Sequence, residues 1–298
     1  MIVKKGGAML KYVSLIIDVE NSRGYDTEER NVMQEFMIDC IKKLNVLFSG
    51  AIQFEMTFSA GDEMQGLFRD VTSAVLYLRL FEMLIRPVKI RAGIGVGEWN
   101  VKIEDGLSTE QDGPVYHRAR QAIEEVYKKQ TQRYRICSGL DDTLMNHLLN
   151  ASCILKEQQG YMQNIAFIIM ELLYPFSKGD LVVYKHDIIT DLLKIKYEYK
   201  IGKRTNYQKA LGLYSGDADT CLHEDVLYVV DAINIDGASL ESEDMVIKKN
   251  MSSNIAEVLG CKRQNADMLI KRGNSIVIRT MDYTALQYLE REQRMYGI

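Results

Sequence analysis

The sequence predicts an α+β fold in which a ferredoxin-like (palm) domain precedes a mainly helical domain. Up to about residue 139, short apolar runs typical of buried strands alternate with amphipathic helical patterns. Beyond that point strand patterns become rare, and helical spacing of apolar residues dominates. The chain of 298 residues is also long enough for two ordinary domains. We therefore expect one domain at 10–139 and a second at 140–298.

The composition is that of a soluble globular protein rather than a disordered or membrane-spanning one. Apolar residues make up 47% of the chain and charged residues 26%, with a net charge of -4. No apolar run approaches the ~20 residues that a membrane helix needs, and the first residues lack the apolar stretch of an export signal. The five cysteines are scattered without a CxxC motif, which favours reduced thiols over zinc ligands. These features predict a cytoplasmic protein without a membrane partner.

The first predicted elements are a strand, a helix and a hairpin. Lys11–Val19 is a short β-branched apolar run that contains an acid at its end, which is typical of a central buried strand. Thr27–Phe48 has apolar residues three or four apart, so we expect an amphipathic helix. Ala51–Phe68 alternates around a glycine, which predicts a hairpin that turns at Gly61 to Glu63.

The next elements complete the predicted sheet. Asp70–Ile85 has helical spacing, and Val88–Trp99 has the pattern of a strand whose glycines permit close backbone approach. Gly113–Lys129 begins with a proline suited to the first turn of a helix, and Tyr134–Gly139 is a further strand. The order strand, helix, hairpin, helix, strand, helix, strand is that of a palm sheet with its helices on one face.

Three carboxylates fall on neighbouring parts of this predicted sheet. Asp18 lies at the end of the first strand, and Asp62 and Glu63 lie at the hairpin turn. In a palm sheet these places are adjacent, and carboxylates held that close repel one another unless a cation neutralises them. Mg²⁺ prefers such hard oxygen ligands and completes its shell with water and substrate phosphates. The alternative is purely local: Asp18 caps the following segment, while Asp62 and Glu63 only form the turn.

Four motifs in the first half carry a family resemblance. In chain order they are "LIIDVENSR", "SAGDEMQGLF", "IRAGIGVGEW" and "DGPVYHRARQAIE". Together they resemble the SatD family of bacterial proteins over about residues 12–122, and more loosely to the C-terminal end. More distantly, the same half is similar to the class III nucleotide cyclases and to the GGDEF domain of diguanylate cyclases. The resemblance implies a nucleotide-cyclase-like palm that binds divalent metal ions and a nucleotide.

The resemblance also implies which acids hold the metal. Asp18 and Asp62 match the metal positions of the cyclases, and Glu63 matches a ligand position in the diguanylate cyclases. The implied metal is Mg²⁺ or Mn²⁺, and the implied ligand is a nucleoside triphosphate or a cyclic nucleotide. Cyclase-like palms commonly work as dimers, so the resemblance further implies a homodimer.

A place for the nucleotide follows from the same resemblance. The backbone after Asp18 would hold the triphosphate, and Arg23 can form charge-assisted hydrogen bonds with phosphate. The sequence departs from the cyclases at Phe58, where they have a base-selecting lysine. It departs again at His117 and Gln121, where their last helix has an asparagine and an arginine. The residues expected to contact the nucleotide are Val19, Glu20, Asn21, Ser22, Arg23, His117, Arg118 and Arg120.

A second functional pattern lies near the C-terminal end, at about residues 251–273. Ser253 can cap a first helix, Gly260 can form a turn, and Lys262 to Arg272 have the spacing of a second helix. Basic and amide side chains begin the second helix, which predicts a helix-turn-helix that reads double-stranded DNA. The alternative is an αα-hairpin whose basic residues are simply solvated. The residues expected to contact DNA are Lys262, Arg263, Gln264, Asn265, Lys271 and Arg272.

Three hypotheses for the function follow from these patterns. The first is a nucleotide sensor, in which the palm binds a metal and a nucleotide and biases how the helix-turn-helix meets DNA. The second is an active nucleotidyl cyclase or a related phosphoryl-transfer enzyme. The third is a non-catalytic scaffold. Turnover of a nucleoside triphosphate separates the enzyme from the sensor, and a DNA affinity that depends on nucleotide separates the sensor from the scaffold.

Overall fold

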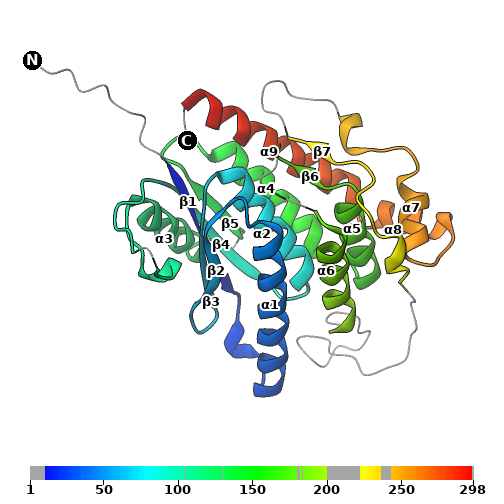
Figure 1. Ribbon diagram of the computed structural model, residues 1–298, viewed down its shortest axis with the longest axis horizontal. Helices are drawn as coiled ribbons and strands as arrows, with labels where there is room; N and C mark the ends of the chain where they lie inside the picture. Colours follow the sequence, from blue (N-terminus) through cyan, green and yellow to red (C-terminus); the bar gives the residue numbers. More distant parts are fainter. Residues whose placement is uncertain are drawn as a thin grey trace, which may run out of the picture.

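The computed structural model describes residues 11–103, 105–129, 131–179, 182, 184–199, 222–235 and 243–296. Its first half contains a five-stranded mixed sheet (Figure 1). The strands are β1 (Tyr12–Val19), β2 (Ile52–Ala60), β3 (Glu63–Phe68), β4 (Ile90–Gly97) and β5 (Tyr134–Cys137). Their order across the sheet is β2-β3-β1-β4-β5; β1 is antiparallel to both of its neighbours, and β4 and β5 are parallel. The predicted α+β class is confirmed.

Helices cover both faces of this sheet. α1 (Thr27–Leu47) and α2 (Val71–Ile85) pack on one face, and α3 (Pro114–Tyr127) packs on the other (Figure 1). The alternation of side chains along β1 reflects this arrangement, because Ile17 belongs to the core under α1 and α2 whereas Ile16 packs against α3. The expectation of helices on one face only is therefore corrected.

Glycines in β4 explain how α3 occupies the second face. A Cβ atom on Gly95 would lie 2.2 Å from the backbone nitrogen of Ala119, and one on Gly93 would lie 2.5 Å from the Ala119 carbonyl oxygen. Real Cβ atoms do not approach backbone so closely, so only glycine lets the helix rest directly on the strand. The close backbone approach that the sequence predicts at this strand is confirmed.

The second half is mainly helical, as the sequence predicts. Its helices are α4 (Thr143–Glu157), α5 (Tyr161–Leu173), α6 (His186–Glu198), α7 (Met251–Val258), α8 (Arg263–Arg272) and α9 (Ser275–Tyr296). The short strands β6 (Phe176–Ser177) and β7 (Ile233–Asn234) pair in parallel. Short 3-10 helices lie at Ser22–Gly24, Ser108–Glu110, Glu224–Val226 and Glu243–Val246. No described helix combines the length and the apolar character needed to cross a membrane.

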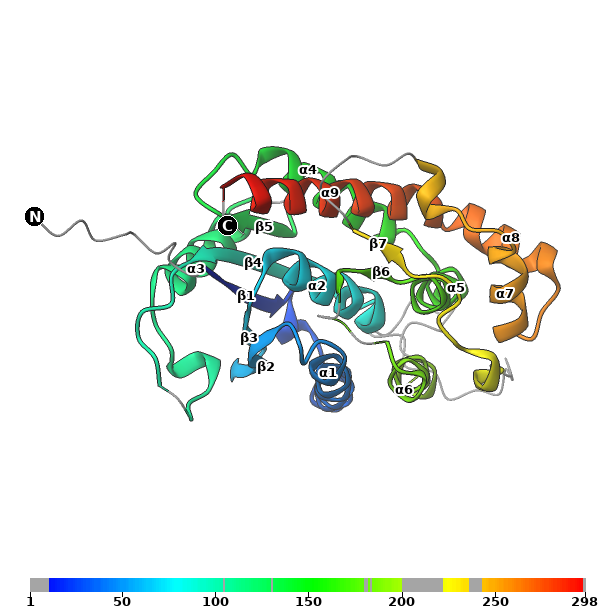
Figure 2. The same cartoon turned by 45° about the horizontal axis from the view of Figure 1, so that its top comes forward.

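One hydrophobic core extends from the sheet into the helical half. It includes Leu15 of β1, Phe36 of α1, Phe167 of α5 and Leu286 of α9, all of which are fully buried. α9 packs along α4 and also contacts α2, as Figure 2 shows. The apolar interior is thus continuous across residue 140, where the sequence changes character.

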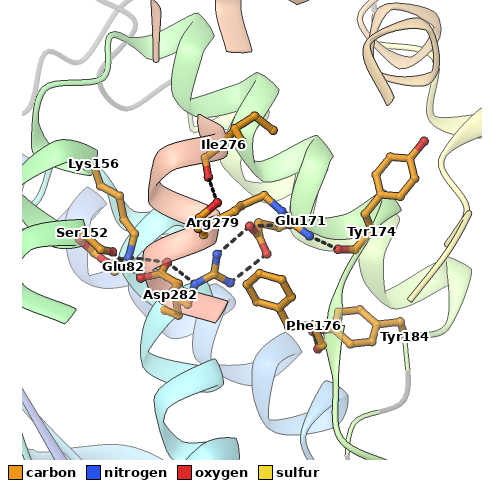
Figure 3. Close-up of polar contacts among 12 residues, drawn as sticks. Glu82, Ser152, Lys156, Glu171, Tyr174, Phe176, Tyr184, Ile276, Arg279 and Asp282 are labelled. Carbon is orange, nitrogen blue, oxygen red and sulfur yellow. Dashed lines mark hydrogen bonds and ion pairs between the residues drawn. The ribbon is translucent and has the colours of Figure 1, made fainter. Parts of the chain in front are cut away.

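Charged side chains also join the two halves inside this core (Figure 3). Arg79 of α2 donates two hydrogen bonds to Glu171 of α5, at 2.7 and 2.8 Å, and a third to Asp282 of α9. Lys156 of α4 lies 2.9 Å from the Glu82 carboxylate of α2 and 3.4 Å from that of Asp282. These side chains are at most 6% exposed, and buried charges of this kind are tolerated only when they are paired. The pairs therefore fix α2 to three helices of the second half.

Candidate functional site

Asp18 places a carboxylate near the end of the central strand. It is the penultimate residue of β1 and lies directly opposite Glu63 of β3 and Arg91 of β4. Because side chains alternate along a strand, Asp18 is on the same face as Ile16, which packs on α3. The hydroxyl of Tyr127, the last residue of α3, is close enough to the Asp18 carboxylate to lower the pKa of that acid. The strand end and the helix end therefore meet at this acid.

The turn after β2 brings two further carboxylates to this end of the sheet. Gly61 and Asp62 join β2 to β3, and Gly61 has a φ of 63°, a left-handed value that glycine adopts without strain. Glu63 is already the first residue of β3, so the turn is shorter than the sequence predicts. The charge of Asp62 acts on the pKa of Asp18, which places the two acids within electrostatic reach.

Burial and repulsion both act on Asp18. They raise its pKa to about 6, chiefly because the carboxyl is partly buried and secondly because Asp62 is negatively charged nearby. The Tyr127 hydroxyl and the charge of Arg91 lower the pKa of Asp18 and so oppose this rise without cancelling it. Ionised Asp18 is therefore destabilising, and a cation beside Asp18 and Asp62 would relieve that effect.

Glu63 differs from the other two acids because an arginine already neutralises it. Arg120 of α3 donates two hydrogen bonds to its carboxylate, at 2.5 and 2.7 Å, and these hold the pKa of Glu63 below its usual range. Among the described residues, no group of three or more His, Cys, Asp or Glu side chains is arranged to hold a metal ion. Asp18 and Asp62 remain, and one or two carboxylates completed by substrate phosphates form a usual donor set for Mg²⁺. The two acids therefore fit a cation that arrives with phosphate.

A pocket of ≈ 380 Å³ lies beside Asp62, between the hairpin turn and α1. Met33 and Met37 of α1 and Phe58 of β2 form its apolar wall. Its polar lining consists of Ser22, Arg30, Gln34 and Asp62. An apolar wall with a few polar groups is typical of small-molecule sites, so Asp62 stands at the edge of a cavity that can receive part of a ligand, whereas Asp18 and Glu63 are not part of its lining.

The segment directly after β1 begins with residues held by contacts inside the protein. Val19 is buried in the core. The Glu20 carboxylate lies 3.0 Å from the guanidinium of Arg91 and 3.3 Å from that of Arg133. These ion pairs tie the start of the segment to β4 and to the approach of β5. The side chains of Val19 and Glu20 thus have partners within the fold.

The next residues of this segment approach the pocket. Asn21 has a left-handed backbone with a φ of 57°, which turns the chain into the 3-10 helix that follows. Ser22 lines the pocket together with Asp62. The side chain of Arg23 lies outside the described part of the structure. Among the described side chains of the predicted phosphate-binding segment, Ser22 borders the cavity.

The three predicted nucleotide-binding residues of α3 point in different directions. His117 is exposed, and its ring lies 3.3 Å from the carboxylate of Asp112. Arg118 donates hydrogen bonds to backbone carbonyl oxygens, including that of Val96 in β4. Arg120 instead donates hydrogen bonds to the carboxylate of Glu63, at the end of the sheet near Asp18. The fold therefore brings one of these three side chains to Asp18 and its neighbours.

Two residues beside Asp18 were not predicted from the sequence. Tyr127 lies about two helical turns after Arg120, so the helical repeat places both on one face and offered a signal for it. Arg91 stacks over the Tyr127 ring, 5.5 Å from its centroid, and pairs with Glu20. Its proximity to Asp18 depends on strand register, which a single sequence does not specify here.

The predicted DNA-contacting residues lie on α8 and at its N-cap, and a turn joins α8 to α7. Gly260 in that turn has a φ of 58°, and Ala266 and Ile270 are the buried side of α8. Lys262 precedes α8 as its N-cap, and Arg263 lies 3.8 Å from Asp267 one turn later. The predicted contact residues, all of them exposed, are Lys262, Arg263, Gln264, Asn265, Lys271 and Arg272. The exposed face of α8 thus carries a basic and amide surface.

A family model described as SatD family matches residues 12–174, which is more than half of the chain. The chain belongs to the SatD family. The matched part of this SatD protein runs from β1 through α5. It contains the acids Asp18, Asp62 and Glu63 and their neighbours Arg91, Arg120 and Tyr127. The α7–α8 pair lies outside the matched part. The resemblance to SatD proteins that the four motifs carry is therefore confirmed.

Other comparisons add little to the family assignment. No curated protein is significantly similar to this SatD protein in sequence. Among solved structures, one similar chain is described as "Structure of a bacterial light-regulated adenylyl cyclase". It shares 12% sequence identity with a TM-score of 0.33, and the similarity covers 45% of the SatD chain and 78% of that chain.

Proposed function

We propose that this SatD protein binds a nucleotide together with Mg²⁺ or Mn²⁺ at the end of its palm sheet. The supporting observation is that Asp62 lines a pocket of ≈ 380 Å³ and that its charge helps to raise the pKa of Asp18 at the same end of the sheet. A divalent cation would stabilise both ionised carboxylates and at the same time hold the negative charge of phosphates. Asp18 and Asp62 would hold the cation, and the pocket would take the base or sugar.

The surroundings of the pocket suit a nucleoside phosphate. Met33, Met37 and Phe58 offer apolar contact to a planar base, and Gln34 has an amide that can both donate and accept hydrogen bonds. The guanidinium of Arg120 is held at Glu63, next to Asp62, where it can also contact the phosphates of a bound nucleotide. A nucleoside triphosphate or a cyclic nucleotide provides each of these partners in one molecule.

Two residues of α3 favour nucleotide binding without turnover. In cyclases an asparagine and an arginine on the last helix orient the ribose and stabilise the transition state, and His117 and Gln121 stand at the matching positions here. His117 lies beside Asp112, and Gln121 donates a hydrogen bond to Glu125 on the same exposed surface. A sensor that holds its nucleotide unchanged is therefore our first proposal, with a cyclase or related phosphoryl-transfer enzyme as the alternative.

Calorimetric titration of ATP and GTP with Mg²⁺ or Mn²⁺ tests the site. We expect metal-dependent binding that weakens by at least about 100-fold in the Asp18→Asn/Asp62→Asn double variant, because both carboxylates then lose their charge. Glu55→Gln removes an exposed carboxylate of β2 and serves as the control for charge loss alone. Equal affinity in the double variant and the wild type would refute the site. Chromatography of the mixtures then separates sensor from enzyme, since only an enzyme yields cyclic or linear products.

The pKa of Asp18 supplies a folding control for this experiment. Its value of about 6 exceeds the ordinary 3.8, so the wild type loses stability as pH rises from about 4 to 6, and the loss persists above pH 6. Asp18→Asn removes that loss. Urea unfolding should therefore show the variant to be more stable than the wild type at pH 7.5, by about 1 kcal/mol after allowance for solvent screening, and equally stable near pH 4. If the single variant Asp18→Asn also loses nucleotide binding, that loss would then not reflect unfolding.

We also propose that the exposed face of α8 binds double-stranded DNA. The supporting observation is the placement of Lys262, Arg263, Lys271 and Arg272 on the outside of a helix that follows a glycine turn and is anchored by Ala266 and Ile270. Basic residues at both ends of such a helix suit phosphates on either side of a major groove, and amides near its start suit base edges. A nucleotide sensor in the palm would then have a DNA-binding output.

Fluorescence anisotropy with a mixed-sequence duplex tests this second proposal. Replacing Lys262, Arg263, Lys271 and Arg272 together by glutamine should weaken binding at low salt by at least about tenfold and reduce its salt dependence, because phosphate contacts release counterions. The control carries the same substitution at four exposed basic residues of the first half. Those residues are Lys42, Arg69, Lys128 and Lys129. If both variants lose affinity equally, the binding reflects overall charge rather than α8.

A further inference from the structure

We propose that Arg120 and Glu63 form an exchangeable ion pair that makes the cation and the phosphate depend on each other for binding. The inference rests on the proposed nucleotide function and concerns how that site is assembled. In the described structure Arg120 holds Glu63 with two hydrogen bonds, and Glu63 is adjacent to Asp62 and directly opposite Asp18. The pair therefore stands between the two acids that would hold the cation and the helix that borders them.

The pair is positioned to open. The Arg120 side chain is 43% exposed and the Glu63 side chain 18%, so both reach solvent at the rim of the site. Among the described residues, the Glu63 carboxylate also accepts a hydrogen bond from the Ser59 hydroxyl, at 3.1 Å. A rim ion pair of this kind contributes little net stability, because water solvates both partners when they separate. Its opening is therefore governed by what replaces each partner.

A cation alone has no favourable way to recruit Glu63. While Arg120 donates to both oxygens of Glu63, a cation meets Asp18 and Asp62 only. If Glu63 turned to the cation, the guanidinium of Arg120 would be left without its anion and next to a second positive charge. The pair thus weakens the affinity of the empty site for a bare divalent ion.

Phosphate alone meets the opposite difficulty. The planar guanidinium of Arg120 matches the oxygens of a phosphate, so a phosphate can take the place of Glu63. Glu63 would then be ionised and unpaired beside Asp18 and Asp62, three negative charges next to an anion. Binding of phosphate without a cation is therefore disfavoured.

Together the two ligands exchange partners without leaving a charge unpaired. Glu63 passes from Arg120 to the cation, and Arg120 passes from Glu63 to the phosphate. The number of ion pairs rises rather than falls, and the cation gains a third carboxylate. Each ligand consequently raises the affinity of the site for the other, a coupling that must be equal in both directions.

The Arg120→Gln variant tests the exchange because it predicts changes of opposite sign. Calorimetry should show Mn²⁺ alone binding at least about tenfold tighter than to the wild type, since Glu63 is freed. Preformed Mn·ATP should bind at least about tenfold weaker, since the phosphate loses its guanidinium. Arg120→Lys keeps the charge but cannot hold both oxygens, so it should shift both affinities in the same directions by less.

Arg69→Gln is the matched control. It removes the same charge from an exposed arginine directly after β3, at the other end of that strand from Glu63, so both affinities should stay at the wild-type values. If Arg120→Gln weakens both ligands, or changes neither, while the wild type binds Mn·ATP, the exchange is wrong and the nucleotide site stands. If the wild type binds neither Mn²⁺ nor Mn·ATP, the proposed function fails and the exchange fails with it.

Discussion

Replacing Asp282 by asparagine should lower the free energy of unfolding by about 3–5 kcal/mol, the usual effect of removing one partner from a buried ion pair. The Asp282 side chain is 0% exposed and accepts from Arg79 and Ser152, with Lys156 at 3.4 Å. Asparagine keeps the size of the side chain, but it removes the negative charge that stabilises the buried cations of Arg79 and Lys156. Natural stabilities of roughly 5–15 kcal/mol make this a large share of the total.

Urea unfolding followed by circular dichroism measures this effect. The control is Asp191→Asn, which breaks the pair between Lys43 and Asp191, 2.5 Å apart with both side chains 40% exposed. That change should alter stability by less than about 1 kcal/mol, because water solvates the partner left behind. Comparable losses in the two variants would show that Asp282 is hydrated in solution and does not bind α9 to α2.

The second large effect is expected at Gly95. In Gly95→Ala the new Cβ would stand 2.2 Å from the backbone nitrogen of Ala119 and 2.3 Å from the carbonyl oxygen of Val115. Backbone atoms cannot rotate away, so α3 must lift from β4. We expect a loss of at least about 3 kcal/mol, at the upper end for overpacked cores. The lift should also separate Arg120 from Glu63 and abolish Mn·ATP binding, as calorimetry can measure.

Gly97→Ala provides a graded control on the same strand. Its Cβ would lie 3.0 Å from the nearest backbone atom of α3, the nitrogen of Val115, so a shift of a few tenths of an ångström suffices. Stability should fall by about 1 kcal/mol or less, and Mn·ATP should still bind. If Gly95→Ala and Gly97→Ala lower the free energy of unfolding by the same amount, α3 lies farther from β4 in solution than in the described structure.

Local sequence patterns predicted most of the elements well. The first helix was expected at Thr27–Phe48 and extends over Thr27–Leu47, because a regular apolar stripe and a capping acid define it. The hairpin and the glycine-rich strand were also correctly placed, since glycine and apolar alternation are local signals. The turn proved shorter, because Glu63 has a strand partner in Asp18 that lies outside the local sequence.

Long-range pairing explains what the sequence did not predict. The helical pattern of α2 gave no reason to bury Arg79 and Glu82, yet all of α2 is buried. Their partners, among them Glu171 and Lys156, lie on α4, α5 and α9 and become visible only when the helices pack. The second face of the sheet was missed for a similar reason: glycine indicates close approach but does not say which helix approaches.

The positions of the three acids could be predicted from the sequence, but their partners could not. Strand order alone places Asp18, Asp62 and Glu63 at one end of the sheet, and the structure brings them there. The pairing of Glu63 with Arg120 was not predicted, because it depends on the rotation of α3 about its axis. Their binding of metal and nucleotide stays a prediction, as does DNA binding by α8.

The buried pairs of α2 have a consequence for the order of events during synthesis. Arg79 and Asp282 are 203 residues apart, and Arg79 and Glu171 are 92 apart. At about 5–20 residues per second, a ribosome needs on the order of ten to forty seconds to proceed from the first of these helices to the last. Arg79 and Glu82 lack Glu171 and Lys156 until α4 and α5 have been made, and Arg79 and Lys156 lack Asp282 until α9 follows. The sheet of the palm can form early, but its final packing has to wait for α9.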